Sequence, residues 1–112
     1  MSWAKPVIGT AWSGNLDFMD ENTAYLIPWR PGEVPEGSYI LPAGSLWADP
    51  DIGAAAATMR HVWLHPDEAR ATGERGRLSI RRTHGIEAAA QVVRARFAAI
   101  GAQLQPAGSS PA

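Results

Sequence analysis

Cysteine is missing from this chain of 112 residues, and phenylalanine and tyrosine are scarce, with two of each. Without cysteine the chain can form no disulfide bond and carry out no thiolate chemistry, which agrees with a cytoplasmic location. No apolar run is long enough to cross a membrane, and the amino terminus lacks the pattern of a signal peptide. We therefore expect a cytoplasmic protein without a transmembrane segment.

Charge of one sign is also lacking, because the formal net charge is only −1. The balance gives no electrostatic reason to expect an anionic membrane or nucleic acid as partner. Basic residues do gather between Arg70 and Arg96, but Glu68, Glu74 and Glu87 are mixed among them, without interleaved aromatic residues. This pattern is typical of solvated helix faces, and we expect no nucleic-acid partner.

What the sequence does contain is a short apolar strand followed by small residues, in the segment KPVIGTAWSGNLDFM at 5–19. Residues 7–9 predict a buried parallel strand. Ser13, Gly14 and Asn15 then favour a tight turn, and residues 16–19 predict one helical turn capped by Asn15. Tyr25–Ile27 predicts a second short strand that Pro28 stops.

This order places backbone N–H groups at the carboxyl edge of a sheet, where α/β proteins hold anionic ligands. Ser13, Gly14 and Asn15 are therefore candidate phosphate-binding residues, although such a turn can also be a plain connector. Asp17 and Trp12 are possible members of the same crevice, and Asp17 can equally be a first-turn acid of the helix.

The second half of the chain is helical. Residues 29–46, rich in proline and glycine and including Arg30, read as an irregular loop. Asp49 and Pro50 resemble a cap and a first helical residue, and helices are predicted at 51–64, 67–82 and 86–100, the last stopped by Gly101. Apolar or small residues recur at helical spacing in each helix: Ile52, Ala55, Ala56, Met59 and Trp63, then Ala69, Gly73, Gly76 and Ile80, then Ile86, Ala89, Ala90, Val93, Phe97 and Ile100.

In their order and spacing, PVIGTAWSGNLDFM, NTAYLIP at 22–28 and LWADPD at 46–51 resemble the donor-domain half of GT-B glycosyltransferases of the family 4 type. The resemblance runs from Met1 to about Ile100. It implies an α/β fold: a partial Rossmann-like donor domain with short parallel strands followed by three helices. Residues 1–104 would be the C-terminal part of a nucleotide-sugar-binding domain, with an insertion at about 29–46, and 105–112 predict a disordered tail.

For function, the resemblance implies transfer of a sugar from a nucleotide-sugar donor to an acceptor with retention of configuration and without a metal or other cofactor. The family's E-x7-E glutamates would precede Met1, and the acceptor domain would lie outside this chain. We therefore assign no catalytic residue and expect no transfer by the chain alone. The alternative is a non-catalytic α/β binding or interaction module. His61, His65 and His84 lack a third ligand at metal-binding spacing, so no metal site is expected.

Overall fold

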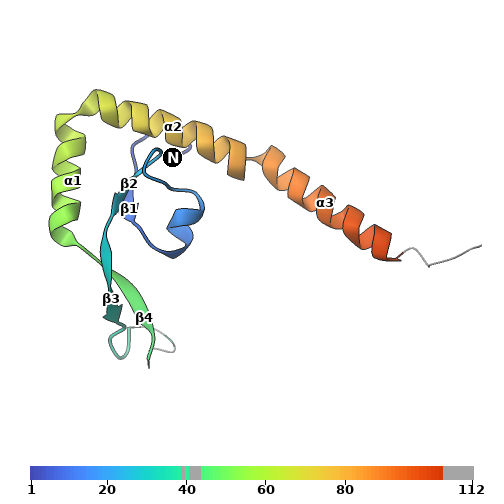
Figure 1. Cartoon of the computed structure of the whole chain (residues 1–112), viewed down its shortest axis with the longest axis horizontal. Coiled ribbons are helices and arrows are strands. Elements are labelled where there is room, and N and C mark those ends of the chain that lie inside the picture. Colours follow the sequence, from blue (N-terminus) through green and yellow to red (C-terminus); the bar gives the residue numbers. More distant parts are fainter. Residues whose placement is uncertain (39, 41–43, 105–112) are drawn as a thin grey trace, which may run out of the picture.

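A computed structural model describes residues 1–38, 40 and 44–104, so the predicted tail at 105–112 lies outside the described residues. The fold is mixed α/β, with short strands first and long helices after them (Figure 1). In chain order the elements are β1 (Ile8–Thr10), a 3-10 helix η1 (Ser13–Asp17), β2 (Tyr25–Ile27), β3 (Trp29–Glu33), β4 (Leu46–Pro50), α1 (Ile52–Leu64), α2 (Pro66–His84) and α3 (Ile86–Leu104).

Strands β1 and β2 pair in parallel, with Ile8 opposite Tyr25 and Thr10 opposite Ile27. Helix α1 packs against both strands, and α2 crosses above them (Figure 1). Both predicted strands are confirmed, the first displaced by one residue. Their pairing brings the two carboxyl ends, at Thr10 and Ile27, to the same edge.

Strands β3 and β4 form a second, antiparallel pair in which Arg30 faces Asp49 and Trp29 faces Pro50. The prediction of an irregular loop over 29–46 is therefore wrong at its beginning and at its end. The sequence does not predict β3, because Pro31 and Gly32 are both unfavourable in strand interiors. Pairing with a segment that follows a turn stabilises β3 regardless of this local preference.

The three predicted helices are confirmed, with different ends. Asp51, not Asp49, caps α1: its side chain accepts a hydrogen bond of 2.9 Å from the backbone N–H of Ala54. Pro50 belongs to β4 instead of the helix. Helix α3 continues through Gly101 to Leu104, so Gly101 does not stop it.

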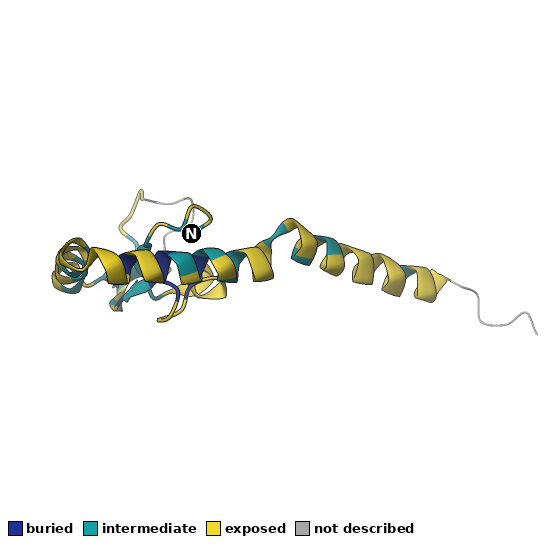
Figure 2. Ribbon diagram, turned by 90° about the horizontal axis from the view of Figure 1, so that it is seen from above, coloured by how far each residue is buried: buried dark blue, intermediate teal, exposed yellow. Residues whose placement is uncertain are grey.

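The small residues of α2 face the core (Figure 2). Ala69, Thr72, Gly73 and Gly76 are all buried on this helix. A Cβ atom on Gly76 would lie 2.7 Å from the carbonyl oxygen of Thr23, and one on Gly73 would overlap the carbonyl of Ala4. The predicted face of small residues on α2 is confirmed. It lets the backbone of the amino-terminal segment and of the loop before β2 approach the helix closely.

The apolar stripes of α1 and α3 lie largely uncovered. On α1, Ile52 is 73% exposed and Trp63 is 82% exposed, and on α3 Phe97 is 71% exposed. Helix α3 extends away from the other elements (Figure 1). The radius of gyration is accordingly 21.4 Å, against roughly 13 Å for a compact domain of this size. Helical periodicity identified these faces but did not determine what would cover them.

Candidate functional site

The predicted phosphate turn lies at the carboxyl edge of the parallel pair. The chain leaves β1 at Thr10, the N–H of Ala11 donates to the carbonyl of Ile27, and η1 begins three residues after the strand. Ser13 has a left-handed backbone, with φ of 48°. Ser13 and Gly14 are exposed, and a Cβ on Gly14 would meet only Asp17 Oδ2, at 3.9 Å. The turn is thus accessible and can accept a side chain at Gly14 without strain.

Asn15 and Asp17 differ from their predicted roles. The 3-10 helix begins at Ser13 with Trp12 at the cap position, so Asn15 lies inside the helix and does not cap it. Its side-chain amide instead donates to the carbonyl of Thr10, at 3.0 Å, and ties the turn back to β1. Asp17 is the last residue of η1 and not an acid of its first turn. Because η1 is so short, the Asp17 carboxylate still lies close to its start, with Oδ2 3.9 Å from the position of a Cβ on Gly14.

Trp12 connects this turn to a cavity. Its ring meets the ring of Trp29 edge to face, with 4.1 Å between the centroids and 66° between the planes. Trp29 lines a cavity of about 320 Å³ formed by residues 28–30 and 49–52. The cavity therefore lies at the base of the β3–β4 hairpin, beside the start of α1.

Charged groups surround this cavity. Arg30 Nε donates to Asp49 Oδ2 at 3.2 Å across the hairpin, and both side chains retain substantial exposure. Asp51 also lines it while capping α1. The backbone N–H of Asp51 donates to the carbonyl of Pro28, at 2.9 Å, and closes the base of the hairpin. Arg30, predicted as a loop residue, thus lies on a strand and has an acidic partner.

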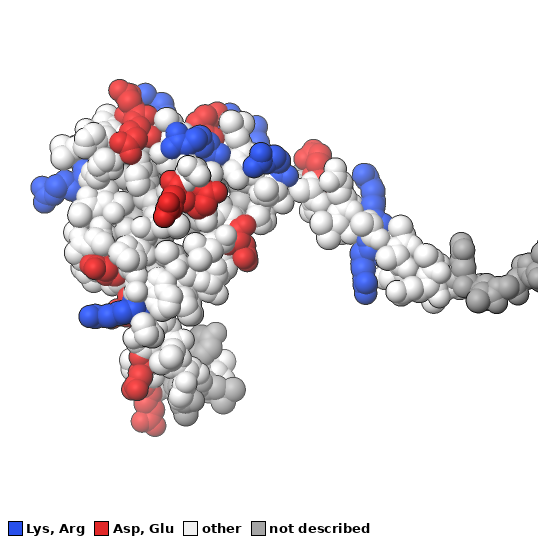
Figure 3. Space-filling model, viewed as in Figure 1, with Lys and Arg blue, Asp and Glu red and all other residues white. Residues whose placement is uncertain are grey.

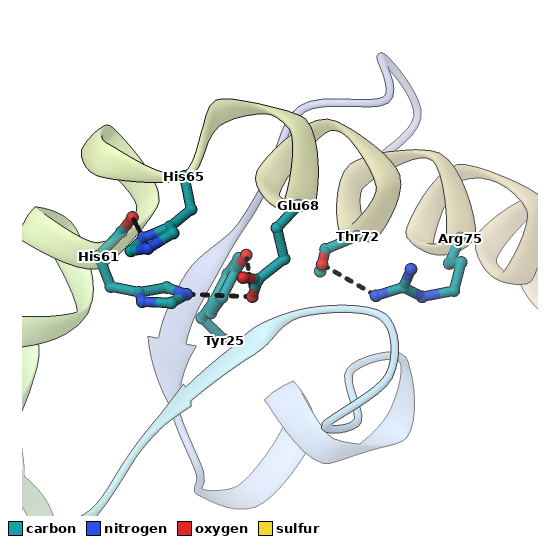
Figure 4. Close-up of polar contacts among 6 residues, drawn as sticks. All are labelled: Tyr25, His61, His65, Glu68, Thr72 and Arg75. Atoms are coloured by element: carbon teal, nitrogen blue, oxygen red, sulfur yellow. Dashed lines mark hydrogen bonds and ion pairs between the residues drawn. The ribbon is translucent and has the colours of Figure 1, made fainter.

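A second polar cluster joins β2, α1 and α2 (Figure 4). His61 Nε2 donates to Glu68 Oε1 at 3.0 Å, and the Tyr25 hydroxyl approaches the same oxygen at 3.4 Å. His65 Nδ1 donates to the carbonyl of His61 at 2.9 Å, and the two imidazole rings stack with centroids 4.2 Å apart. These contacts fix the corner between α1 and α2.

The cluster changes the acidity of its carboxyl group. The hydrogen bond from His61 lowers the pKa of Glu68 below its ordinary value of 4.5, and the nearby Tyr25 hydroxyl acts in the same direction. On the same helix, the hydrogen bond from Arg77 likewise lowers the pKa of Glu74. Acidic and basic side chains are interspersed along α2 (Figure 3), as its sequence predicted.

Over residues 1–38, 40 and 44–104, no group of three or more histidine, aspartate or glutamate side chains is placed to hold a metal ion. Within the same residues, no helix is both long and apolar enough to cross a membrane.

Sequence reasoning did not identify the cavity or the His61–Glu68 contact. The cavity depends on the hairpin register, which brings Arg30 and Asp49 together from 19 positions apart. The opposite charges at these two positions were the available signal, since such pairs favour cross-strand neighbours. Comparison with protein-family models, curated proteins and solved structures found no match to this chain.

Proposed function

We propose that this chain contributes the phosphate-binding part of the donor site in a retaining glycosyltransferase that uses a nucleotide sugar. In this proposal the chain is part of a Rossmann-like donor domain, and residues 13–15 receive the donor diphosphate. The observation that carries it is the accessible small-residue turn at the carboxyl edge of the β1–β2 pair. Parallel sheets hold anionic ligands at this edge.

Two details of the turn support phosphate binding. Ser13 and Gly14 are exposed and carry no acidic side chain themselves, so a ligand can reach their backbone. The bond from Asn15 to Thr10 holds the turn in a fixed position relative to the strand. Such preorganisation reduces the entropy that binding must remove.

The chain alone is proposed to transfer no sugar and to hold the donor weakly. Transfer requires donor and acceptor held together in a reactive geometry, and the resemblance places the glutamates and the acceptor domain outside this sequence. A few N–H groups facing water cannot enclose a ligand as most small-molecule sites do.

The test is an NMR titration of the labelled chain with UDP-glucose and GDP-mannose, together with a radiolabelled transfer assay. We expect saturable changes at the amides of residues 13–15 and no transfer. Gly14→Val should abolish these changes while the chain stays folded, because the nearest atom leaves room for a side chain. Gly101→Val, on exposed α3, is the matched control. Turnover, or titration shifts that leave residues 13–15 unchanged, would contradict the proposal.

The uncovered apolar stripes favour a second candidate, a non-catalytic interaction module. Large exposed apolar patches commonly mark surfaces that contact another protein, and Met59 and Trp63 on α1 are exposed, as is Phe97 on α3. The titration separates the candidates, because a module of this kind needs no response to nucleotide sugars at residues 13–15.

A further inference from the structure

We infer that the cavity at the base of the β3–β4 hairpin binds a neutral saccharide. The cavity is separate from the phosphate turn, and its ligand chemistry follows from its own lining, so the inference does not require the donor site proposed above. Its volume of about 320 Å³ is at the lower end of the range for small-molecule pockets, roughly 300–1,000 Å³. A ligand of one or two sugar rings suits this size.

The polar lining offers both hydrogen-bond donors and acceptors. Oδ2 of Asp49 accepts a hydrogen bond from Arg30 Nε, and Oδ1 of Asp51 accepts one from the backbone N–H of Ala54. An ionised carboxylate has about four lone-pair sites, so each can accept further bonds. The largely exposed guanidinium of Arg30 presents additional N–H donors. A sugar hydroxyl both donates and accepts, and it can therefore bind to either kind of group.

The apolar lining comes from Trp29 together with Pro28, Pro50 and Ile52. Trp29 is one of the lining residues, and its indole packs edge to face with the ring of Trp12. An indole fixed in this way supplies a rigid, flat surface at little cost in side-chain entropy. The C–H groups on one face of a sugar ring pack well on such a surface, while the hydroxyls at the ring edge reach the carboxylates and the guanidinium.

The charges disfavour the other ligand classes. Two carboxylates and one guanidinium give the lining a formal charge of −1, counting Asp49, Asp51 and Arg30. A phosphate would be repelled by the two carboxylates, Asp49 and Asp51. The backbone N–H of Ala54 at the start of α1 already donates to Asp51, so it is not available to a phosphate. An organic cation would meet the guanidinium of Arg30, whose charge is permanent. A neutral polyol avoids both conflicts.

The test is an NMR titration of the full chain with four neutral probes: the methyl glycosides of glucose, galactose and mannose, and N-acetylglucosamine. We expect saturable shifts of the Trp29 indole N–H and of the amides at positions 30, 49 and 51 with at least one probe. Trp29→Ala should weaken this affinity about tenfold or more, from loss of the aromatic contact. Asp49→Asn should also weaken it, and it decides the matter if Trp29→Ala disturbs the hairpin.

Trp63→Ala and Asp67→Asn are the matched controls, because both side chains are exposed and lie outside the cavity. Both should bind the probe as the unchanged chain does. Inorganic diphosphate and tetramethylammonium are titrated in parallel. The inference is overturned if no neutral probe saturates, if either ion shifts the cavity residues instead, or if Trp29→Ala and Asp49→Asn bind with unchanged affinity. Shifts at residues 13–15 without a response of the Trp29 indole or of positions 30, 49 and 51 report on the donor site and not on this cavity.

Discussion

The carbonyl oxygen of Ala4 lies where a side chain on Gly73 would have to stand, so the amino-terminal segment touches α2 backbone to backbone. We expect Gly73→Ala to destabilise the chain. The substitution gains about 1 kcal/mol in helix propensity, but the overlap with main-chain atoms forces a backbone shift that costs about 1–3 kcal/mol.

Urea unfolding followed by circular dichroism would measure this change. Gly101→Ala is the control, because nothing lies within 4 Å of its added Cβ, and it should stabilise α3 by up to about 1 kcal/mol. Equal stabilisation by both substitutions would refute the close contact at Gly73.

The cap of α1 is the subject of the second prediction. Asp51→Ala should lower the free energy of unfolding by about 1 kcal/mol, because the N–H of Ala54 loses its acceptor. Asp49→Ala, which removes only an exposed ion pair with Arg30, should cost less, roughly 0.5 kcal/mol. Hydrogen exchange at Ala54 adds a local measurement, since only Asp51→Ala should accelerate it. Faster exchange in Asp49→Ala would instead favour Asp49 as the cap.

The ring contact between Trp12 and Trp29 predicts energetic coupling. In a double-mutant cycle of Trp12→Ala and Trp29→Ala, we expect a coupling energy of about 0.5–1.5 kcal/mol. The same cycle with Trp3→Ala in place of Trp12→Ala should be additive, because Trp3 is 87% exposed. Chemical unfolding monitored by circular dichroism, which does not depend on the removed fluorophores, provides the free energies. Additivity in both cycles would mean that the two rings do not stabilise one another.

The fourth prediction concerns pH. The folded-state pKa of Glu68 is lowered, and the largest cause is the hydrogen bond from His61. This bond therefore stabilises the fold at pH values above the unfolded pKa of 4.5, and the contribution is lost as the pH falls through the folded value. Glu68→Gln should reduce the loss of stability in that acidic range, as measured by thermal unfolding at a series of pH values.

Carboxyl-carbon NMR titration tests the cause of the shift. His61→Ala should raise the pKa of Glu68 toward 4.5, whereas Arg77→Gln should raise the pKa of Glu74 and leave Glu68 unchanged. A Glu68 titration that is the same in His61→Ala and in the unchanged chain would show that His61 is not the main cause.

Sequence patterns within a few residues were sufficient to predict the three helices and β2. The stripes of α1, α2 and α3 gave three helices, and the apolar run before Pro28 gave β2, because periodicity and proline act within a few residues. The hairpin could not be predicted in this way. Trp29–Glu33 contains Pro31 and Gly32, and its strand conformation depends on pairing with Leu46–Pro50.

The candidate site was predicted in outline. The turn at residues 13–15 lies at the expected edge, but its internal structure differs, since 3-10 bonding starts at Ser13 and Asn15 turns back to Thr10. The sequence predicted Asp49 as the cap of α1, but Pro50 pairs with Trp29 in the hairpin and the helix is capped by Asp51. The cavity and the His61–Glu68 contact required tertiary positions that no local pattern contains.

The β3–β4 hairpin joins the rest of the chain at its base, so a small change of angle there displaces its far end. Pro28 alone separates β2 from β3, and the bond from Asp51 to Pro28 joins the other strand at the same point. Strands of five residues reach about 17 Å from this pivot. A tilt of about 10° at the base thus moves the far ends, at Glu33 and Leu46, by about 3 Å. The cavity lies at this base and is lined by residues of both strands, so a ligand bound there would contact the hairpin at the point where a small tilt has the largest effect on its far end.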